Sequence, residues 1–221
     1  MTKHITLKTG GDPRTLPDYA ALRDELSKLT HPARPDVNWQ YVQRLCLSMF
    51  EQNGVELQTA AWYTLARTHQ SGLAGLNEGL AILEALISRQ WETLWPKTQH
   101  ARMEILSGLS QRLQQRMRML PFNSSHLSEL YRAEALLTSL SAVLQRLELK
   151  HLSQLDTLRT LIRSNAERLE SSNETSDLNV NMKPDSESPL EKAEPIEEVK
   201  WVYVVHQENQ PNGRSEERRV G

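Results

Sequence analysis

Histidines have the widest chemical range of the side chains in this 221-residue sequence, since they serve as metal ligands and as acid–base groups. A zinc site of the HExxH kind needs two histidines four residues apart on one helix face. No pair of histidines in this sequence has that spacing. We therefore expect no metal site. We interpret all seven histidines as surface or loop residues, namely His4, His31, His69, His100, His126, His151 and His206.

Nucleophile and phosphate motifs give no other chemistry. No serine stands in a GxSxG elbow, and no GxxxxGK[ST] or GxGxxG loop occurs. The run GLAGLNEGL at 72–80 holds three glycines, but leucines alternate with them at helical spacing, which predicts a helix start with close packing. Cys46 lies in an apolar stripe, so we expect a buried thiol. The sequence predicts no catalytic residue and no cofactor, and we expect a protein that is not an enzyme.

The charge pattern does not favour nucleic acid or a membrane surface as a partner. The segment QRLQQRMR at 111–118 holds three arginines, but Leu113 and Met117 interleave with them, which is typical of an amphipathic helix with a solvated face. Residues 1–170 carry only a small positive net charge. No run approaches the ~18 apolar residues of a membrane span, and the first residues lack the apolar core of a signal peptide. We expect a cytoplasmic protein.

Apolar periodicity predicts an all-α fold, a bundle of about seven helices with a long helical hairpin near its end. No strand pattern competes within 1–170. The last two helices approach heptad spacing and are joined by a short link near Lys150 and His151, which predicts that they are antiparallel. The expected helices are 17–29, 36–52, 56–70, 73–94, 99–120, 126–149 and 152–170.

Turn and capping residues mark the helix ends. Pro17 suits a first helical turn, Asp36 is the expected N-cap of the second helix, and Ser124 or Ser125 that of the sixth. Gly108, inside the fifth helix, is expected to permit the close approach of another helix. Breaks between helices are expected at Asn53–Gly54, Ser71–Gly72, Pro96 and Pro121.

The composition changes after residue 170. Residues 171–199 hold eight acidic and two basic residues and no aromatic residue, so we expect a disordered acidic linker over 171–200. The tail 201–221 is unassigned. Within it, 201–205 is a candidate strand that either starts a second domain or pairs with a partner's sheet edge. The end, GRSEERRVG, resembles a translated sequencing-adapter read-through, so we expect 214–221 to be an artefact and the natural chain to differ after about Asn212. The alternative is a charged disordered tail.

Two tryptophans, Trp91 and Trp95, stand four residues apart at the end of the fourth predicted helix, with Pro96 behind them. On one helix side they would be neighbours, and a buried tryptophan removes ~150–250 Å² from water. Tryptophan is also enriched at protein interfaces, so a partner-facing patch is the alternative. We interpret the pair mainly as packing residues that fix this helix end against its neighbours.

The motifs GGDPRTLPDYAALRDEL at 10–26, NW at 38–39 and ELQTAAWYTLARTHQSGLAGLNEGLAILEALISRQWETLWP at 56–96 resemble the ImpA N-terminal domain. That domain is found in TssA-like proteins of bacterial type VI secretion systems. Two departures are Asn38, where the family often has aspartate, and LPD after DPR in place of a more acidic phrase. The residues that carry the resemblance are Asp12, Pro13, Arg14, Trp39, Trp62, Gly72, Leu73, Gly75, Leu76, Trp91, Trp95 and Pro96.

The resemblance implies a helical domain over 8–170 and a structural role without catalysis. Some TssA-like proteins prime the tail sheath and tube at the baseplate, and others, of the VasL and TagA types, stop or hold the distal sheath end. The segment ELQTAAWYTLAR is more similar to the VasL/TagA type, but the choice between priming and stopping stays open. The expected partners are sheath, baseplate or a TssA-type cap, which would place the protein in the cytoplasm or, through the apparatus, at the inner face of the inner membrane. The alternative is a generic helical adaptor of another bacterial assembly. Oligomeric state stays open.

Overall fold

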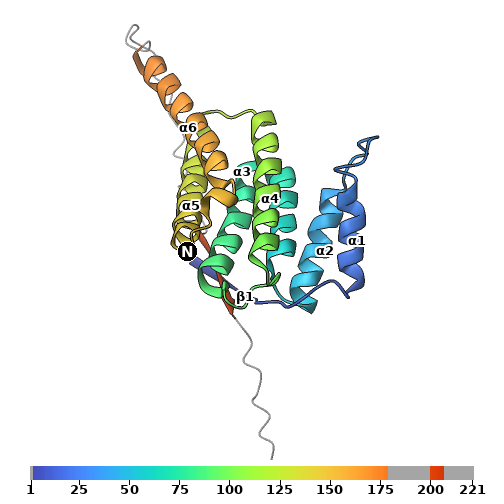
Figure 1. Cartoon of the computed structure of the whole chain (residues 1–221). Coiled ribbons are helices and arrows are strands. Elements are labelled where there is room, and N and C mark those ends of the chain that lie inside the picture. Colours follow the sequence, from blue (N-terminus) through green and yellow to red (C-terminus); the bar gives the residue numbers. More distant parts are fainter. Residues whose placement is uncertain (1, 179–199, 207–221) are drawn as a thin grey trace, which may run out of the picture.

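The structure, a computed structural model, describes residues 2–178 and 200–206, with side chains placed over 7–175. Helices α3, α4, α5 and α6 pack around one another, and α1 and α2 form a flank on α3 (Figure 1). The predicted all-α class is confirmed. The elements are β1 (Thr2–Lys8), α1 (Pro17–Ser27), α2 (Trp39–Gln52), α3 (Leu57–Gln90), α4 (Gln99–Met119), η1 (Ser124–His126), α5 (Leu127–Arg146), η2 (Lys150–Leu152), α6 (Leu155–Leu178) and β2 (Lys200–His206).

Helix α3 is two helices that fold back against each other. Its backbone leaves helical geometry at Ser71 and Gly72, and Gly72 has a φ of 56°, which favours glycine. The Tyr63 hydroxyl donates to the Glu78 carboxylate over 2.6 Å, across the fold. The predicted break at 71–72 is therefore confirmed, while the second half ends at Gln90 instead of 94.

Glycines allow the two halves of α3 to touch. A Cβ at Gly79 would overlap the side chain of Thr64, and one at Gly75 would overlap the carbonyl oxygen of Arg67. Both glycines are buried. The close packing predicted for the run 72–80 is present, with its partner in the same element.

Two predicted N-caps are wrong. Helix α2 begins at Trp39, and its N-cap is Asn38, whose side chain accepts a hydrogen bond from the Tyr41 amide at 3.0 Å. Asn38 is held there because its own amide donates to Glu25 of α1 over 2.7 Å, so the expected cap at Asp36 lies in the preceding loop. Before α5, the turn η1 is capped by Asn123 and not by either serine that follows it.

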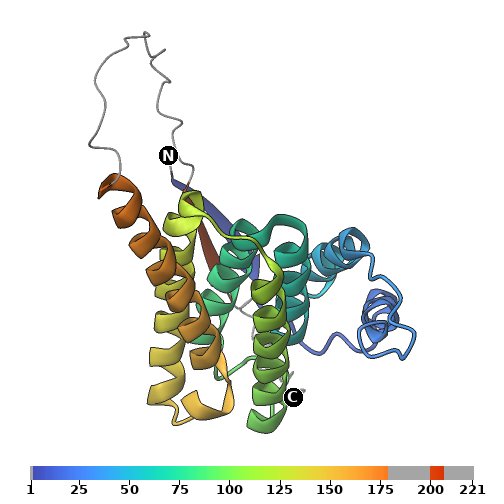
Figure 2. The ribbon, with the colours of Figure 1, turned by 90° about the horizontal axis from the view of Figure 1, so that it is seen from above.

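The predicted hairpin of the last two helices is confirmed as α5 and α6. Glu134 of α5 pairs with Arg163 of α6 at 2.6 Å, and Ser141 donates to Asp156 over 2.9 Å. Most leucines of the two helices are buried in the core, and others are partly buried against it. Figure 2 shows α5 and α6 side by side on the face of the molecule away from α1.

Strands β1 and β2 pair in parallel, from Thr2 opposite Lys200 to Lys8 opposite His206. The expectation of no strand within 1–170 is therefore wrong for β1. Its partner lies almost the whole chain away, and no local pattern reports such a pairing. The candidate strand at 201–205 is confirmed as a strand, but it pairs with the chain's own first strand.

Helix α6 continues through Leu178, so residues 171–178 of the predicted linker are helical. Extending a helix that is already formed carries no nucleation cost and adds one backbone hydrogen bond for each residue, which explains why these polar residues continue α6. The rest of the predicted linker, 179–199, and the tail 207–221 with the suspected artefact lie outside the described residues. No helix among those described has the length and apolarity to cross a membrane.

Candidate functional site

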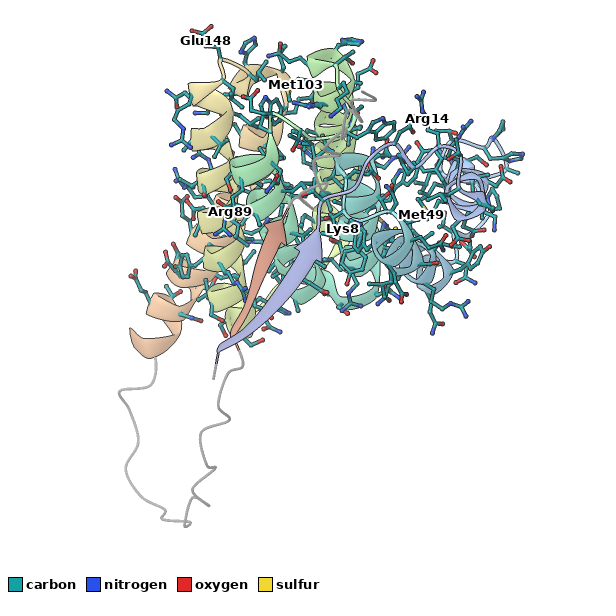
Figure 3. The ribbon with its side chains drawn as sticks, turned by 90° about the horizontal axis from the view of Figure 1, so that it is seen from below. Lys8, Arg14, Met49, Arg89, Met103 and Glu148 are labelled. Atoms are coloured by element: carbon teal, nitrogen blue, oxygen red, sulfur yellow. The ribbon has the colours of Figure 1, made fainter. Side chains whose placement is uncertain are left out.

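The segment Asp12-Pro13-Arg14 forms a turn between β1 and α1. The Asp12 carboxylate accepts hydrogen bonds from the Arg14 amide at 3.0 Å and from the Arg14 Nη2 at 2.7 Å. Hydrogen bonds from the Arg14 side chain and backbone lower the pKa of Asp12. The Arg14 guanidinium lies 5.6 Å from the centroid of the Trp95 ring, a cation–π distance. Figure 3 shows Arg14 further along the chain from Lys8, on the way to α1.

The loop after α3 is held by Arg102 of α4. Its side chain donates to three carbonyl oxygens, those of Pro96 at 2.6 Å, Trp91 at 2.8 Å and Leu94 at 2.5 Å. Its guanidinium also lies 4.6 Å from the centroid of the Trp91 ring. Arg102 is 5% exposed, and this burial lowers its pKa. A buried guanidinium with its donors on backbone carbonyls fixes the course of the loop.

Glu56 is fully buried at the start of α3, where it serves as the N-cap. Its carboxylate accepts from the amides of Gln58 and Thr59, each at 2.7 Å, and from the Thr59 hydroxyl. Burial raises the pKa of Glu56 to about 7, against the opposing effect of these hydrogen bonds. The backbone amide of Leu57, the first residue of α3, donates to the Trp95 carbonyl over 3.2 Å. This hydrogen bond joins the start of α3 to the loop that follows α3.

Trp91 and Trp95 do not share a helix side, contrary to the prediction. Helix α3 ends at Gln90, so Trp91 is its C-cap and Trp95 lies in the loop, before a cis peptide bond to Pro96. Carbonyls of this non-helical segment accept hydrogen bonds from Arg102. Trp91 faces Arg102 and Trp95 faces Arg14, and both rings are half-buried.

A groove follows α4 on its side toward α3 and the end of α1, and we name it the α4 groove. One part is a cleft of about 590 Å³ and the next a hollow of about 200 Å³, which share Gln58, Glu104 and Ile105. The cleft is also lined by Arg14, Trp95, Pro96, Lys97, Thr98 and Ala101, and the hollow by Leu29, Ala61, Trp62, Leu65, Gly108, Leu109 and Arg112.

Gly108 opens onto the α4 groove. It is exposed, and a Cβ built on it would meet nothing within 4 Å. Among the described residues no other helix comes close to it, so the predicted close contact is absent within the chain itself. The sequence could not distinguish it from Gly75 and Gly79, because a glycine inside a helical stripe looks the same in both situations.

The remaining family-motif residues gather at the opposite end of the first half of α3. Trp39 stacks on His69 with ring centroids 4.0 Å apart. Burial, and then the charge of Arg116, lowers the pKa of His69 to about 4. Gly72 makes the turn just beyond, and Leu73 and Leu76 are buried behind it.

The motif residues thus form two clusters. Asp12, Pro13, Arg14, Trp91, Trp95 and Pro96 lie at one end, Trp39 and Gly72 with the buried leucines at the other, and Trp62 lies between them in the α4 groove, 5.3 Å from the ring of Tyr19.

Sequence reasoning missed Arg102 and Glu56, both buried. Arg102 directly precedes the apolar position Met103 in α4, so its position along the helix resembled that of the solvated arginines further on. Glu56 directly precedes a helix, which is a weak capping signal. Within the described residues, no group of three His, Cys, Asp or Glu side chains has the arrangement of a metal site. The buried ionisable groups of this region are bound to backbone and to a neighbouring hydroxyl, which is a structural arrangement.

The architecture defines an all-α domain with its motif residues at the two ends of one helix and an open groove beside it. Residues 6–111 match the family model described as ImpA, N-terminal, type VI secretion system. The solved N-terminal domain of the TssA component of the type VI secretion system from Burkholderia cenocepacia, which includes the conserved ImpA_N region, has a similar fold. Its TM-score is 0.60 at 17% sequence identity, over 74% of this chain and 88% of that one. No curated protein matches the sequence.

Proposed function

We propose that this chain is a non-enzymatic assembly component of a bacterial type VI secretion system. Its helical domain, over 8–170, binds baseplate, sheath or cap proteins and controls assembly of the tail sheath and tube. The observation that carries the proposal is the ImpA N-terminal match over residues 6–111, which contain the first cluster and most of the α4 groove. The role is either priming at the baseplate or stopping and holding the distal sheath end, on the cytoplasmic side.

The polar chemistry of the domain supports binding in place of catalysis. The Glu56 carboxylate accepts the hydrogen bonds that cap α3, and the Arg102 side chain donates to three backbone carbonyls. An active site needs a titratable group directed at a cavity where a substrate fits. The groove instead offers apolar rings and charged side chains at its rim, which are the components of a protein interface.

Deletion of the gene followed by complementation tests the proposal. The measurements are secretion of the tail-tube protein into the medium and binding of the purified chain to each purified sheath and baseplate protein. The expected result is loss of secretion, restored by the wild-type gene, with direct binding to at least one component. Normal secretion together with no binding to any component would refute the proposal.

Live imaging distinguishes the two roles. A fluorescent fusion that arrives before the sheath begins to grow indicates priming. One that arrives when the sheath reaches the opposite side of the cell indicates stopping.

A further inference from the structure

We propose that the α4 groove is the docking site for one amphipathic helix with an acidic edge, supplied by another component of the secretion apparatus. The inference rests on the proposed function and adds to it the surface and the chemistry of the partner.

The shape of the groove fits a helix. The residues of α4 that line it recur at helical spacing from Ala101 to Arg112, and those of α3 from Gln58 to Leu65. At 1.5 Å per residue, the stripe on α4 is roughly 17 Å long, the length of about three helical turns. Two neighbouring helices with facing stripes leave a trough that seats a third, which is the arrangement of helix-in-groove recognition.

Gly108 indicates that the trough is kept open. A glycine inside a helix costs roughly 1 kcal/mol relative to alanine. At Gly75 and Gly79 close packing within the chain explains that cost. At Gly108 no atom of the described residues occupies the space, so the chain gives no internal reason for the missing side chain. A helix laid in the groove would come closest to α4 at this point.

The side chains along the groove specify the edges of the partner. Trp62 and Ile105 offer apolar surface in the middle. Lys97 lies at one end and Arg112 at the other, while Glu104 is the one acidic residue among those that line the groove. The charge of Arg14 is partly balanced by Asp12. The positive ends favour acidic side chains on the partner helix, with apolar side chains between them.

A filled groove tests the site. G108L adds a side chain where there is space and improves helix propensity, so the folded state is retained. A142L is the matched control, because it adds a leucine to an exposed position on α5, away from the groove. The probes are the purified sheath, baseplate and cap proteins of the same system. For each protein that binds the wild-type chain, we expect G108L to raise the dissociation constant at least tenfold and A142L to leave it unchanged.

Charge reversal tests the acidic edge. K97E/R112E should weaken the same binding tenfold or more, and the loss should be recovered when acidic residues of the partner helix are changed to lysine. R132E/R146E is the control, with the same change in charge at exposed positions of α5. Circular dichroism and thermal unfolding of every variant show whether it is folded.

The outcomes separate the two proposals. Binding by wild type that G108L and K97E/R112E leave intact overturns the groove and leaves the secretion role standing. Absence of binding by wild type to every component, with normal secretion on deletion, overturns both. A dimer of the chain alone that G108L dissociates identifies a second copy as the occupant, against our inference. A tenfold gain in affinity on neutralising the acidic residues of 179–199 identifies the chain's own acidic segment, also against it.

Discussion

Arg102 and Glu56 place ionisable groups inside the domain and satisfy them with backbone atoms. The Arg102 side chain donates to carbonyls of the loop that follows α3, and it packs on the Trp91 ring. Glu56 supplies acceptors to the first amides of α3. The two groups lie on either side of the hydrogen bond from the Leu57 amide to the Trp95 carbonyl. Together they fix the start of α3 against the loop that follows its second half.

Loss of the Arg102 donors should destabilise the domain strongly. R102M keeps a long side chain but leaves the carbonyls of Trp91, Leu94 and Pro96 without these donors, and we expect a loss of about 2–4 kcal/mol in the free energy of unfolding. Urea unfolding followed by circular dichroism measures it. The control is R118M, at an exposed position on the same helix, which should change the free energy by less than about 0.5 kcal/mol. Equal effects of the two substitutions would contradict the assigned role.

Glu56 should make stability depend on pH. Its pKa is about 7 in the folded protein, against 4.5 as the ordinary value, so folding takes up a proton between these values. The stabilisation is complete below pH 4.5 and is lost as the pH rises to 7. Relative to E56Q, wild type should lose at most about 3 kcal/mol between pH 4.5 and pH 8. Urea unfolding at several pH values measures this difference, and E51Q, at an exposed glutamate, is the control. Parallel curves for wild type and E56Q would show that Glu56 does not titrate in this range.

At the scale of elements, the fold back within α3 determines much of the domain. The turn at Ser71 and Gly72 brings Glu78 beside Tyr63 and Arg67, and it lets each half contact different neighbours. The first half contributes Trp62 and Leu65 to the α4 groove, and Asn77 in the second half donates to the Glu129 carbonyl of α5 over 3.0 Å. The turn thus separates a face that lines the α4 groove from a face that packs against α5.

The same substitution at two glycines should have opposite effects. G79A forces a methyl into the Thr64 side chain, and we expect a loss of about 1–3 kcal/mol despite the better helix propensity of alanine. G108A meets open space, so it should gain up to about 1 kcal/mol. Urea unfolding of the two variants beside wild type measures both. A gain in stability at Gly79, or a loss at Gly108, would mean that the glycine is packed differently from the arrangement in the structure.

Helices were predictable where the signal is local. Leucine spacing gave the α5–α6 hairpin, and Ser71–Gly72 gave the break in α3, because both depend on neighbours in sequence. Asn38 and Asn123 displaced the expected caps through contacts of their own. The site was less accessible. The α4 groove depends on how α4 lies against α3, and Gly108 has no sequence feature that distinguishes an open position from a packed one. Arg102 and β1 escaped prediction for the same reason, since their partners are remote.

On the scale of the whole molecule, β1 and β2 link the two ends of the described chain. β2 also lies along α3, and the ladder is extended by a bridge between Thr9 and Val55. The hydrogen bonds from the Val55 amide to the Lys8 carbonyl, at 2.6 Å, and from the Gly10 amide to the Val55 carbonyl, at 2.7 Å, tie β1 to the start of α3. The strands therefore join the helical bundle at the edge that carries Glu56.

Removal of β2 should lower the thermal stability of the helical domain. A chain of residues 1–199 lacks only the second strand when compared with a chain of residues 1–206. Because β1 then loses its backbone partner, we expect the shorter chain to unfold about 2–6 °C lower, from a loss of roughly 1–2 kcal/mol. Differential scanning calorimetry measures both chains under the same conditions. Identical midpoints would mean that the strand pair adds nothing to the stability of the helices.

The parallel direction of the two strands also decides where a fused label would sit. Lys8 and His206 lie at the same end of the pair, beside Val55 and only a few residues from Gln58 of the groove. Thr2 lies at the other end, roughly 20 Å away at 3.3 Å per strand residue. A fluorescent protein joined directly after His206 would therefore crowd the groove and compete with any partner there. One joined ahead of Thr2 leaves it accessible, and an imaging experiment on this chain should carry its fluorophore on the amino-terminal side.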